Sequence, residues 1–420
     1  MARVSQRMVW VVFALMLLAA PMALSSSFSI AILCQIGIAI IACLSYNVLL
    51  GQGGMLSFGH AVYSGLGSFL AIHALNLASA GKLSIPVSLI PLVGGLTGLL
   101  FAVLLGYVST KKSGTTFAMI TLGVGELVFA MSLMFPEFFG GERGISGNRV
   151  VGEPFLGVTF GPQRQVYYLI AAYTFASVWA MYAFTRTPLG RMLNAVRDNA
   201  ERVEFVGYDA RRVRYLAFII AGFFAGISGG LAALNFEIVT AEVMSSTRSG
   251  AYLLFTFVGG TTFFIGPIIG AVLMVLAITL FSGLTKAWLL YLGLIFVFMV
   301  IYAPGGIASL IMMNVRVASF GRLRELLPRY AAMLASVSVM FAGASALIEM
   351  AYHTQLDGVS GSELRFLGVG WNTHNPWHWA AASAVMLLGG VCFEAVRRRF
   401  AAHWGRIQAA LEYAANQERP

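Results

Sequence analysis

The stretch Leu49–Ala71 reads LLGQGGMLSFGHAVYSGLGSFLA, which combines the apolarity of a membrane span with glycines that interrupt a helix. A weaker copy follows at Phe257–Ala277, FVGGTTFFIGPIIGAVLMVLA. Each copy has a Gly-Gly pair, at residues 53–54 and 259–260, just before a longer apolar run. Interrupted helices at matching places in the two halves of a membrane chain indicate a transport pathway.

The composition of the whole chain fits a membrane protein and excludes a soluble one. Of the 420 residues, 59% are hydrophobic and only 10% are charged, whereas soluble domains carry about 25% charge. Long apolar runs recur from end to end, without the alternating polarity of a β-barrel. The net charge of +10 fits basic residues in cytoplasmic loops, because no basic patch with interleaved aromatics indicates nucleic acid. The three cysteines lack the spacing of metal ligands.

Runs of about twenty apolar residues mark the expected membrane spans. They predict an all-α, polytopic transmembrane bundle with about ten core spans, glycine-broken half-helices and an additional C-terminal two-helix hairpin. The N-terminal segment resembles a signal peptide, and the sequence leaves its cleavage open. The predicted spans lie at residues 9–25, 29–50, 58–78, 85–108, 115–134, 166–185, 215–236, 249–260, 263–282, 287–303, 330–351 and 377–396.

The distribution of basic residues predicts the orientation of these spans. With the N-terminus inside and twelve crossings, 20 of the 27 Lys and Arg residues fall inside and 7 outside. Both termini are then cytoplasmic, and the short span 249–260, which the sequence allows as a crossing or a re-entrant piece, has to cross. The expected organisation is a core at 1–310 with a cytoplasmic coupling loop at 186–214, a basic linker at 311–329, a hairpin at 330–396 and a cytoplasmic tail at 397–420.

The loop at 186–214 contains an amphipathic helix at residues 188–207. Thr187 is its expected N-cap, Pro188 its first residue, and Gly207 its end in a left-handed turn. The helix either lies on anionic lipid or docks a cytosolic partner, and its mixed charges favour docking. The apolar positions at helical spacing are Leu189, Leu193, Val196, Ala200 and Val203.

The two glycine-broken segments are the candidate substrate pathway, although glycines also serve helix packing alone. Half-helix N-termini carry partial positive charge and free N–H groups, which suit a substrate carboxylate. Ser57 and His60 add polar groups there. Glu126 lies mid-span, where a carboxylate is costly, so it either meets a substrate ammonium or stays protonated and holds helices together.

Three absences bound the function. The chain has no G-x-x-x-x-G-K-[ST] loop for ATP and no H-E-x-x-H zinc motif. No nucleophile–base pair is visible either, so an enzyme embedded in the membrane is not expected. If the chain carries out active transport, we therefore expect the energy to come from another subunit. The alternative is a secondary transporter driven by protons or sodium, with Glu126 as the coupling site.

The chain resembles the LivM-type permeases of ATP-binding-cassette importers for branched-chain amino acids, over about residues 35–310. The resemblance is carried by six motifs: NVLLGQGGMLSFGHAVYSGLGSF (47–69), TTFAMITLGVGELV (115–128), FFGGERGISG (138–147), the segment from TPLGRMLNAVRDNAERVEFVGYDARRVRY to GISGGLAAL (187–234), FVGGTTFFIGPIIGAVL (257–273) and IYAPGGI (301–307).

The resemblance implies a bacterial inner-membrane permease subunit that pairs with a LivH-like second permease. It also implies two cytosolic ATPase subunits beneath, which bind the ATP and leave this chain without a cofactor, and a periplasmic substrate-binding protein above. The residues expected in ATPase coupling are Gly190, Arg191, Arg197, Asn199, Glu201 and Gly207. The residues expected along the substrate pathway are Gly51, Gly53, Gly54, Ser57, Gly59, His60, Glu126, Gly259, Gly260, Phe263, Phe264, Gly266 and Pro267.

Two departures from the family pattern bear on the solute. Bulky Phe263 and Phe264 stand where the family has small residues, and the C-terminal hairpin lies outside the usual pattern. Branched-chain or related small amino acids are the expected substrates, and urea, short amides or other small carboxylates are the alternative. The hairpin itself is a candidate docking module for a further partner.

Overall fold

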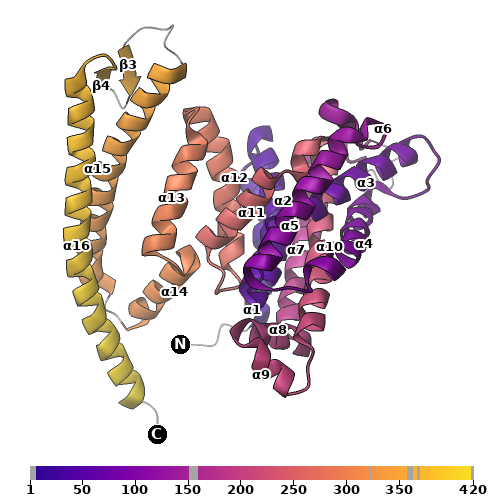
Figure 1. Cartoon of the computed structure of the whole chain (residues 1–420), viewed down its shortest axis with the longest axis horizontal. Coiled ribbons are helices and arrows are strands. Elements are labelled where there is room, and N and C mark those ends of the chain that lie inside the picture. The colour runs from indigo at the N-terminus through magenta and orange to yellow at the C-terminus, as the bar shows by residue number, and fades with distance from the viewer. Residues whose placement is uncertain (1–5, 151–158, 321–322, 357–362, 367–368, 418–420) are drawn as a thin grey trace. The chain divides into compact units, whose positions relative to one another are not determined.

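The computed structural model describes residues 6–150, 159–320, 323–356, 363–366 and 369–417 (Figure 1). These residues are mostly helical, which confirms the all-α class. The helices longer than six residues are α1 Gln6–Ala23, α2 Ser27–Asn47, α3 Ala61–Ser79, α4 Ile90–Ser109, α5 Gly114–Met134, α7 Gln163–Arg186, α8 Pro188–Asp198, α10 Ala210–Phe236, α11 Ser246–Gly259, α12 Gly266–Leu284, α13 Trp288–Tyr302, α14 Gly306–Ser319, α15 Leu323–Leu356 and α16 Pro376–Gln417. The shorter ones are η1 Val48–Gln52, η2 Val87–Leu89, α6 Pro136–Phe139, η3 Gly141–Arg143, α9 Ala200–Phe205 and η4 Ala241–Met244.

A helix lies at each of the twelve predicted spans. By length and composition, nine helices of the described chain can cross a membrane, or ten if α13 and α14, bent by 47°, form one span. The 14-residue helix α11 is not among them. At 1.5 Å per residue it is about 20 Å long, shorter than the roughly 30 Å of a hydrocarbon core. The all-α polytopic bundle is therefore confirmed, but by its length α11 alone does not make the full crossing expected for residues 249–260.

The chain divides into two compact units. Unit 1 comprises residues 1–281 and 294–309, and unit 2 comprises residues 282–293 and 310–420. The boundaries between the units fall inside α12, α13 and α14. Helix α14 enters the segment 311–329, and α16 runs on to Gln417 through the segment expected as a tail.

Helix α10 is the central helix of unit 1, and glycines let α3 and α4 pack closely against it. A Cβ atom on Gly94 would lie 2.6 Å from the carbonyl oxygen of Gly226, and a Cβ atom on Gly226 would overlap the carbonyl oxygen of Gly94. Gly98 faces Gly222 in the same way. Small residues at such spacing let membrane helices approach until their backbones touch, which strengthens van der Waals packing.

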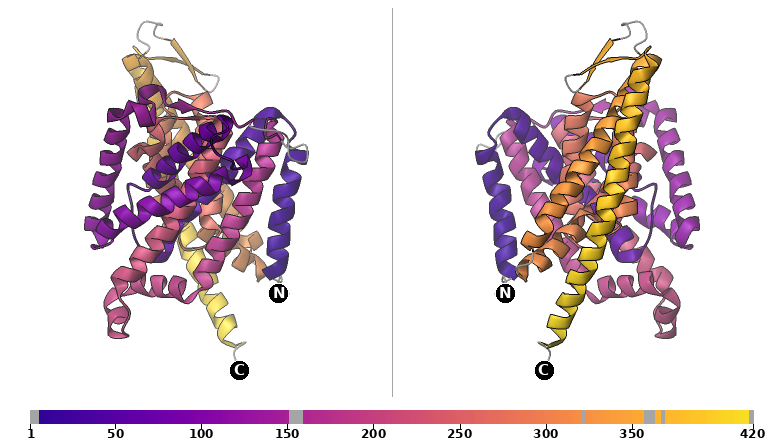
Figure 2. Two further views of the ribbon diagram at one scale, coloured as in Figure 1. Left: turned by 90° about the vertical axis from the view of Figure 1, so that its right-hand side faces the viewer. Right: turned by 90° about the vertical axis from the view of Figure 1, so that its left-hand side faces the viewer.

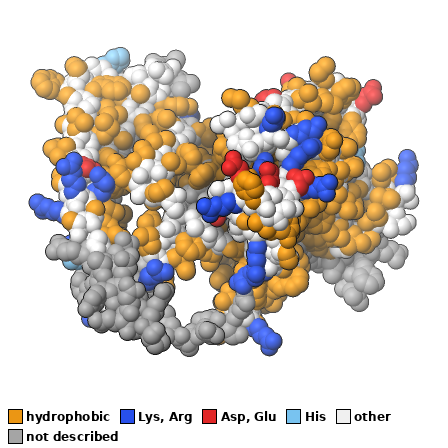
Figure 3. Space-filling view, turned by 60° about the horizontal axis from the view of Figure 1, so that its bottom comes forward, with side chains coloured by type: hydrophobic (Ala, Val, Ile, Leu, Met, Phe, Trp, Pro, Cys, Tyr) orange, Lys and Arg blue, Asp and Glu red, His pale blue; other side chains and the backbone are white. Residues whose placement is uncertain are grey.

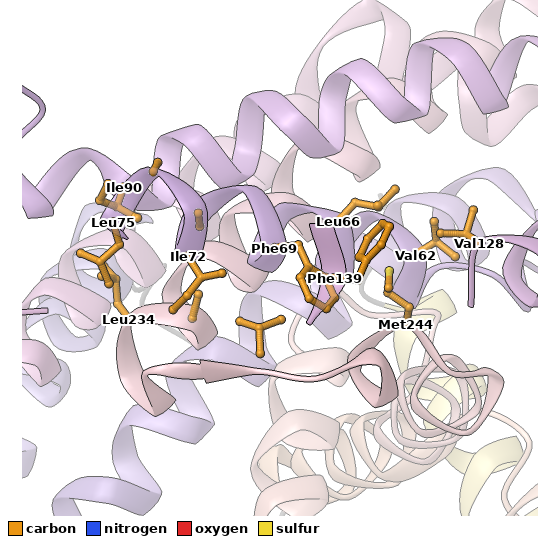
Figure 4. Packing of buried hydrophobic residues seen from close by; sticks show 14 of the residues in the cluster. Val62, Leu66, Phe69, Ile72, Leu75, Ile90, Val128, Phe139, Leu234 and Met244 are labelled. Carbon is orange, nitrogen blue, oxygen red and sulfur yellow. The ribbon is translucent and has the colours of Figure 1, made fainter. Parts of the chain in front are cut away.

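The glycines of α10 are buried against α3 and α4, and α3 contributes the row of apolar side chains that packs beside them. Five buried side chains recur along α3 at helical spacing: Val62, Leu66, Phe69, Ile72 and Leu75. Figure 4 shows this row packed with side chains from α4, α5, α6, α10 and η4, namely Ile90, Val128, Phe139, Leu234 and Met244.

A two-stranded sheet and one buried arginine close the end of unit 1 that lies away from α8. Strand β1 (Ile145–Ser146) pairs antiparallel with β2 (Ile238–Val239). The guanidinium of Arg149 donates to the carbonyl oxygens of Phe160, Gly161, Leu234 and Asn235, at 2.8–3.3 Å. Residue Arg149 as a whole is only 9% exposed, and its backbone N–H donates to the carboxylate of Glu237 at 2.9 Å. This one side chain joins its own loop and the loop before α7 to the C-terminal end of α10.

Replacing Arg149 with alanine is expected to destabilise unit 1 by about 3 kcal/mol or more, because several buried carbonyl groups lose their donor. Arg149→Lys is expected to recover only part of the loss, since an ammonium lacks the planar fork of a guanidinium. Thermal unfolding followed by fluorescence-detected gel filtration measures both. Arg164→Ala, which removes an exposed arginine at the start of α7, is the control and is expected to unfold like the parent.

Unit 2 contains the additional hairpin, in which α15 and α16 run antiparallel and side by side (Figures 1 and 2). Gly343 and Gly389 allow the close approach, because a Cβ on either would lie 2.4 Å from a backbone nitrogen of the facing helix. Strands β3 (Glu363–Phe366) and β4 (Val369–Asn372) connect the helices. Glu349 accepts hydrogen bonds from Thr285 Oγ1 at 2.6 Å and from the hydroxyl of Tyr291 at 3.0 Å.

Candidate functional site

The first glycine-broken segment is a true interruption between α2 and α3. Helix α2 ends at Asn47 and continues as the π-helix η1, a form that is rare and found mostly as single turns at functional sites. Gly54 then has a φ of +63°, a conformation that suits glycine. The chain is non-helical from Gly54 to His60, and α3 begins at Ala61.

The second segment breaks in the same manner between α11 and α12. Helix α11 ends at Gly259, Gly260 has a φ of +109°, and α12 begins at Gly266 with Pro267 in its first turn. A Cβ on Gly266 would overlap the carbonyl oxygen of Gly260, so the turn can close only with glycine. The predicted glycines of both segments thus have a local structural role.

Tertiary packing brings the two segments together. A Cβ on Gly51 would lie 2.5 Å from the carbonyl oxygen of Thr261. The backbone N–H at the start of α3, on Ala61, donates to Ser249 Oγ at 3.0 Å. Thr256 Oγ1 donates to the carbonyl oxygen of Cys43 at 3.4 Å. Helix α11 therefore packs along the C-terminal half of α2, with the two breaks side by side.

Buried polar groups line the first break. Nε2 of His60 lies 2.9 Å from Ser45 Oγ, and the hydroxyl of Tyr46 donates to the carbonyl oxygen of Ser57 at 2.9 Å. At this break, three buried side-chain atoms have no hydrogen-bond partner among the described residues: Asn47 Oδ1, Ser57 Oγ and His60 Nδ1. Buried polar atoms without partners are rare and destabilising. The three atoms at this break are therefore available for further hydrogen bonds.

Glu126 does not join the polar groups of the first break. Helix α5 packs on the break through Thr121, whose Oγ1 accepts the backbone N–H of Phe58 at 3.2 Å, and through Gly125 beside Gly59. Glu126 itself lies on the exposed face of α5. The sequence shows that this carboxylate is mid-span, but only the packing shows which face it occupies.

The two phenylalanines of the second copy also lie at its edge. The ring of Phe264 packs edge-on against Tyr182 of α7, with centroids 5.3 Å apart, and Phe263 is half-buried. No contact of the described residues places either ring between the two breaks.

The loop after α7 forms two helices rather than the single helix predicted at residues 188–207. Thr187 is the N-cap of α8, as expected, and accepts the N–H of Gly190 at 3.2 Å. Asn199 interrupts the helix in an extended conformation, φ −161° and ψ 102°, because its side chain caps α9 by accepting the N–H of Arg202. The single-helix prediction was wrong because asparagine competes for local backbone hydrogen bonds. Gly207 has a φ of +90° and ends the segment after α9, as expected.

Helix α8 contacts the first glycine-broken segment directly. Nη1 of Arg197 donates to the carbonyl oxygen of Gly51 at 2.5 Å. The aliphatic part of the same arginine covers Gly54, where a Cβ would lie 2.8 Å from Arg197 Cγ. Leu193, fully buried, lies beside Gly53. The two candidate sites predicted from distant stretches of sequence are therefore one continuous structure.

The end of the α8–α9 loop carries a surface that sequence reasoning missed. Phe205 is 90% exposed, Val206 75% and Tyr208 51%, whereas Leu193, Val196 and Val203 of the apolar stripe are buried. Figure 3 brings this end of the molecule forward and shows basic and a few acidic side chains gathered among hydrophobic ones. The signal for this surface is a second apolar run, EFVGY at residues 204–208, which does not continue the helical spacing of the apolar stripe.

The described residues contain no group of three His, Cys, Asp or Glu side chains that could hold a metal ion. The arrangement offers instead two breaks in contact, unused polar atoms at one of them, and a helix–loop segment that reaches from an exposed apolar tip to the break. Such an arrangement can transmit a force applied at the tip to the interrupted helices.

Comparisons with known proteins agree on one family. A family model described as "Branched-chain amino acid transport system / permease component" matches residues 28–303. The chain is 27% identical over 292 residues to the high-affinity branched-chain amino acid transport system permease protein LivM of Escherichia coli (strain K12), covering 64% of this chain and 67% of that protein. It is also 27% identical over 289 residues to the LivM protein of Salmonella typhimurium, with the same coverage. No solved structure matches the chain.

Proposed function

The chain belongs to the family of permease components of branched-chain amino acid transport systems, and we propose that it moves a small amino acid through its two glycine-broken segments, driven by separate ATPase subunits. It is a multi-pass permease of the inner membrane.

The contact between α8 and the first break carries the proposal. Arg197 and Leu193 join the loop to Gly51, Gly53 and Gly54, so a displacement of α8 moves the break with it. Gly259 and Gly260 would follow, because the second break packs on the first. The glycines permit such motion because their backbones have no Cβ to restrict them. Alternating access then arises from rocking of these half-helices.

The exposed tip of the loop is the proposed docking site of a cytosolic ATPase subunit. Large exposed apolar side chains beside charged ones are typical of interface anchors. Phe205 and Val206 supply the apolar part, and Arg191 and Glu201, both exposed on the same loop, supply the charged rim. Placement on the ATPase side also agrees with the basic residues that the sequence assigns to the cytoplasm.

The Phe205→Asp, Val206→Asp double variant is expected to weaken binding of the ATPase subunits at least tenfold, since truncating a buried interface anchor costs about 2 kcal/mol or more. Co-purification of the subunits from membranes measures the loss. Val150→Asp, which places a carboxylate at another exposed apolar position, away from this loop, is the control. Equal recovery of the ATPases with both variants would contradict docking at the tip.

A second permease subunit is the proposed partner of α5. Its uncovered face carries Met119 and Met134, both 74% exposed, and Leu127, 57% exposed, with Glu126 in the middle. A carboxylate facing lipid is costly, whereas at a subunit interface it can meet a polar group or a substrate ammonium. Glu126 thus remains a candidate pathway residue, on the inter-subunit side. A periplasmic substrate-binding protein would approach from the β1–β2 end.

Reconstitution of the purified complex in proteoliposomes tests the function. ATP inside is expected to drive uptake of L-leucine, L-isoleucine or L-valine without an imposed ion gradient. Uptake that follows a proton or sodium gradient at constant ATP would favour a secondary transporter with Glu126 as its coupling site. Uptake of urea or short amides in place of amino acids would contradict the proposed solute but not the ATP-driven mechanism.

A further inference from the structure

A cavity of about 120 Å³ lies in unit 1, lined by residues of α2, α3, η4, α10, α11 and α12 and by no residue of the two breaks. One buried water needs roughly 10–15 Å³ of such space, so the cavity has room for a small organic molecule. Its polar lining consists of Gln35, Ser64, Ser68, Ser228, Arg248 and Tyr252, and most of the remaining lining is apolar.

Arg248 gives the cavity a positive charge. It is the third residue of α11 and is partly buried. Its backbone N–H donates a hydrogen bond to Ser245 Oγ at 3.2 Å. Within the described part of the chain, no carboxylate lies at ion-pair distance from its guanidinium. A guanidinium stays protonated in proteins, and a cation within a membrane helix needs a compensating group. A bound anion would supply it.

The serine hydroxyls give the same cavity a set of hydrogen-bond acceptors. Ser64 Oγ donates its hydrogen to the carbonyl oxygen of Ala61 at 3.0 Å, and Ser228 Oγ donates to that of Ala225 at 2.7 Å. Ser68 Oγ lies 2.9 Å from the carbonyl oxygens of Ser64 and Gly229. All three serines are at most 4% exposed. Because each hydrogen is already donated, their oxygens are left to accept, and a ligand ammonium has three N–H groups to donate.

We propose that this cavity is a binding site for a small zwitterionic solute within the single subunit. The guanidinium of Arg248 pairs with the carboxylate, and the serine oxygens accept from the ammonium group. The side chains of Val243, Met274, Val275 and Ile278 contact the solute's hydrocarbon part. The site rests on the cavity and its lining, and only its role in transport rests on the proposed function.

Binding of radiolabelled L-leucine to the full-length chain in nanodiscs tests the site. Competition uses L-alanine, 3-methylbutylamine, which lacks the carboxylate, and 4-methylpentanoate, which lacks the ammonium. Arg248→Gln is expected to weaken leucine binding at least tenfold, and Arg248→Lys less. Arg164→Gln removes an exposed arginine and is expected to bind like the parent. Both one-charge analogues are expected to compete at least tenfold more weakly than leucine.

A second readout remains usable if Arg248→Gln folds poorly. In a Cys392→Ser background, which removes the exposed cysteine, Ser228→Cys places a thiol in the cavity wall. Leucine is expected to slow its modification by a methanethiosulfonate reagent, and 3-methylbutylamine is not. Absence of saturable binding by either amino acid, equal binding by Arg248→Gln and Arg164→Gln, or equal protection by the amine overturns the proposal. Leucine binding without ATP-driven uptake would instead count against the transport function alone.

Discussion

Replacing Gly226 with valine is expected to prevent the chain from folding in the membrane. The Cβ atom would overlap the carbonyl oxygen of Gly94 and lie 3.0 Å from the Cα atom of Gly95. Both obstacles are backbone atoms of α4, so no side-chain rotation relieves them. Overpacking of a core costs about 1–3 kcal/mol where neighbours can adjust and more where they cannot. Separation of α10 from α4 would also expose the buried face of α3.

Fluorescence-detected gel filtration of the chain expressed alone measures this effect as loss of the monodisperse peak. Gly123→Val is the matched control, because a Cβ at that mid-helix position of α5 meets nothing within 4 Å. It is expected to give a normal peak. Gly226→Ala is expected to fall between the two, since one methyl group already overlaps α4. Equal peaks for both valine variants would show that α10 and α4 do not approach as described.

Replacing Arg197 with glutamate is expected to abolish coupled transport while leaving the complex assembled. The variant removes the hydrogen bond from the guanidinium to the carbonyl oxygen of Gly51 and places a carboxylate beside that oxygen. A hydrogen bond to a charged group contributes about 1.5–3 kcal/mol, so its loss predicts a fall in uptake of tenfold or more. Arg197 also forms a salt bridge with Asp198 at 3.0 Å, but both side chains are substantially exposed.

Proteoliposome uptake and ATP hydrolysis, measured on the same preparation, separate coupling from assembly. The Arg197→Glu complex is expected to hydrolyse ATP while uptake is lost. Arg202→Glu, an equal charge reversal on the exposed surface of α9, is expected to keep both activities. Arg197→Lys is expected to recover part of the uptake, because an ammonium can still donate one hydrogen bond to the carbonyl. Normal uptake by Arg197→Glu would show that the contact with Gly51 does not transmit force.

The sequence alone predicted the membrane class, the twelve helices, the two glycine breaks, the N-cap at Thr187 and the turn at Gly207. Each of these depends on a short window of residues. An apolar run has to be satisfied by helical hydrogen bonds in lipid, and a glycine pair or a Thr-Pro step acts on its own backbone. Asn199 lies in the same window, but the apolar stripe continues through it, so the stripe alone predicts one helix where the asparagine cap separates two.

Only the tertiary structure decided which of these local features meet. Gly51 touches both Thr261 and Arg197, and Glu126 faces away from the breaks. Arg149 joins two loops to the end of α10, and Arg248 lines a cavity of unit 1. In a membrane chain almost every helix face is apolar, so hydrophobic periodicity does not distinguish a face that packs on protein from one that meets lipid. Close backbone contacts make that distinction, and they join residues up to about two hundred positions apart, beyond the reach of any local pattern.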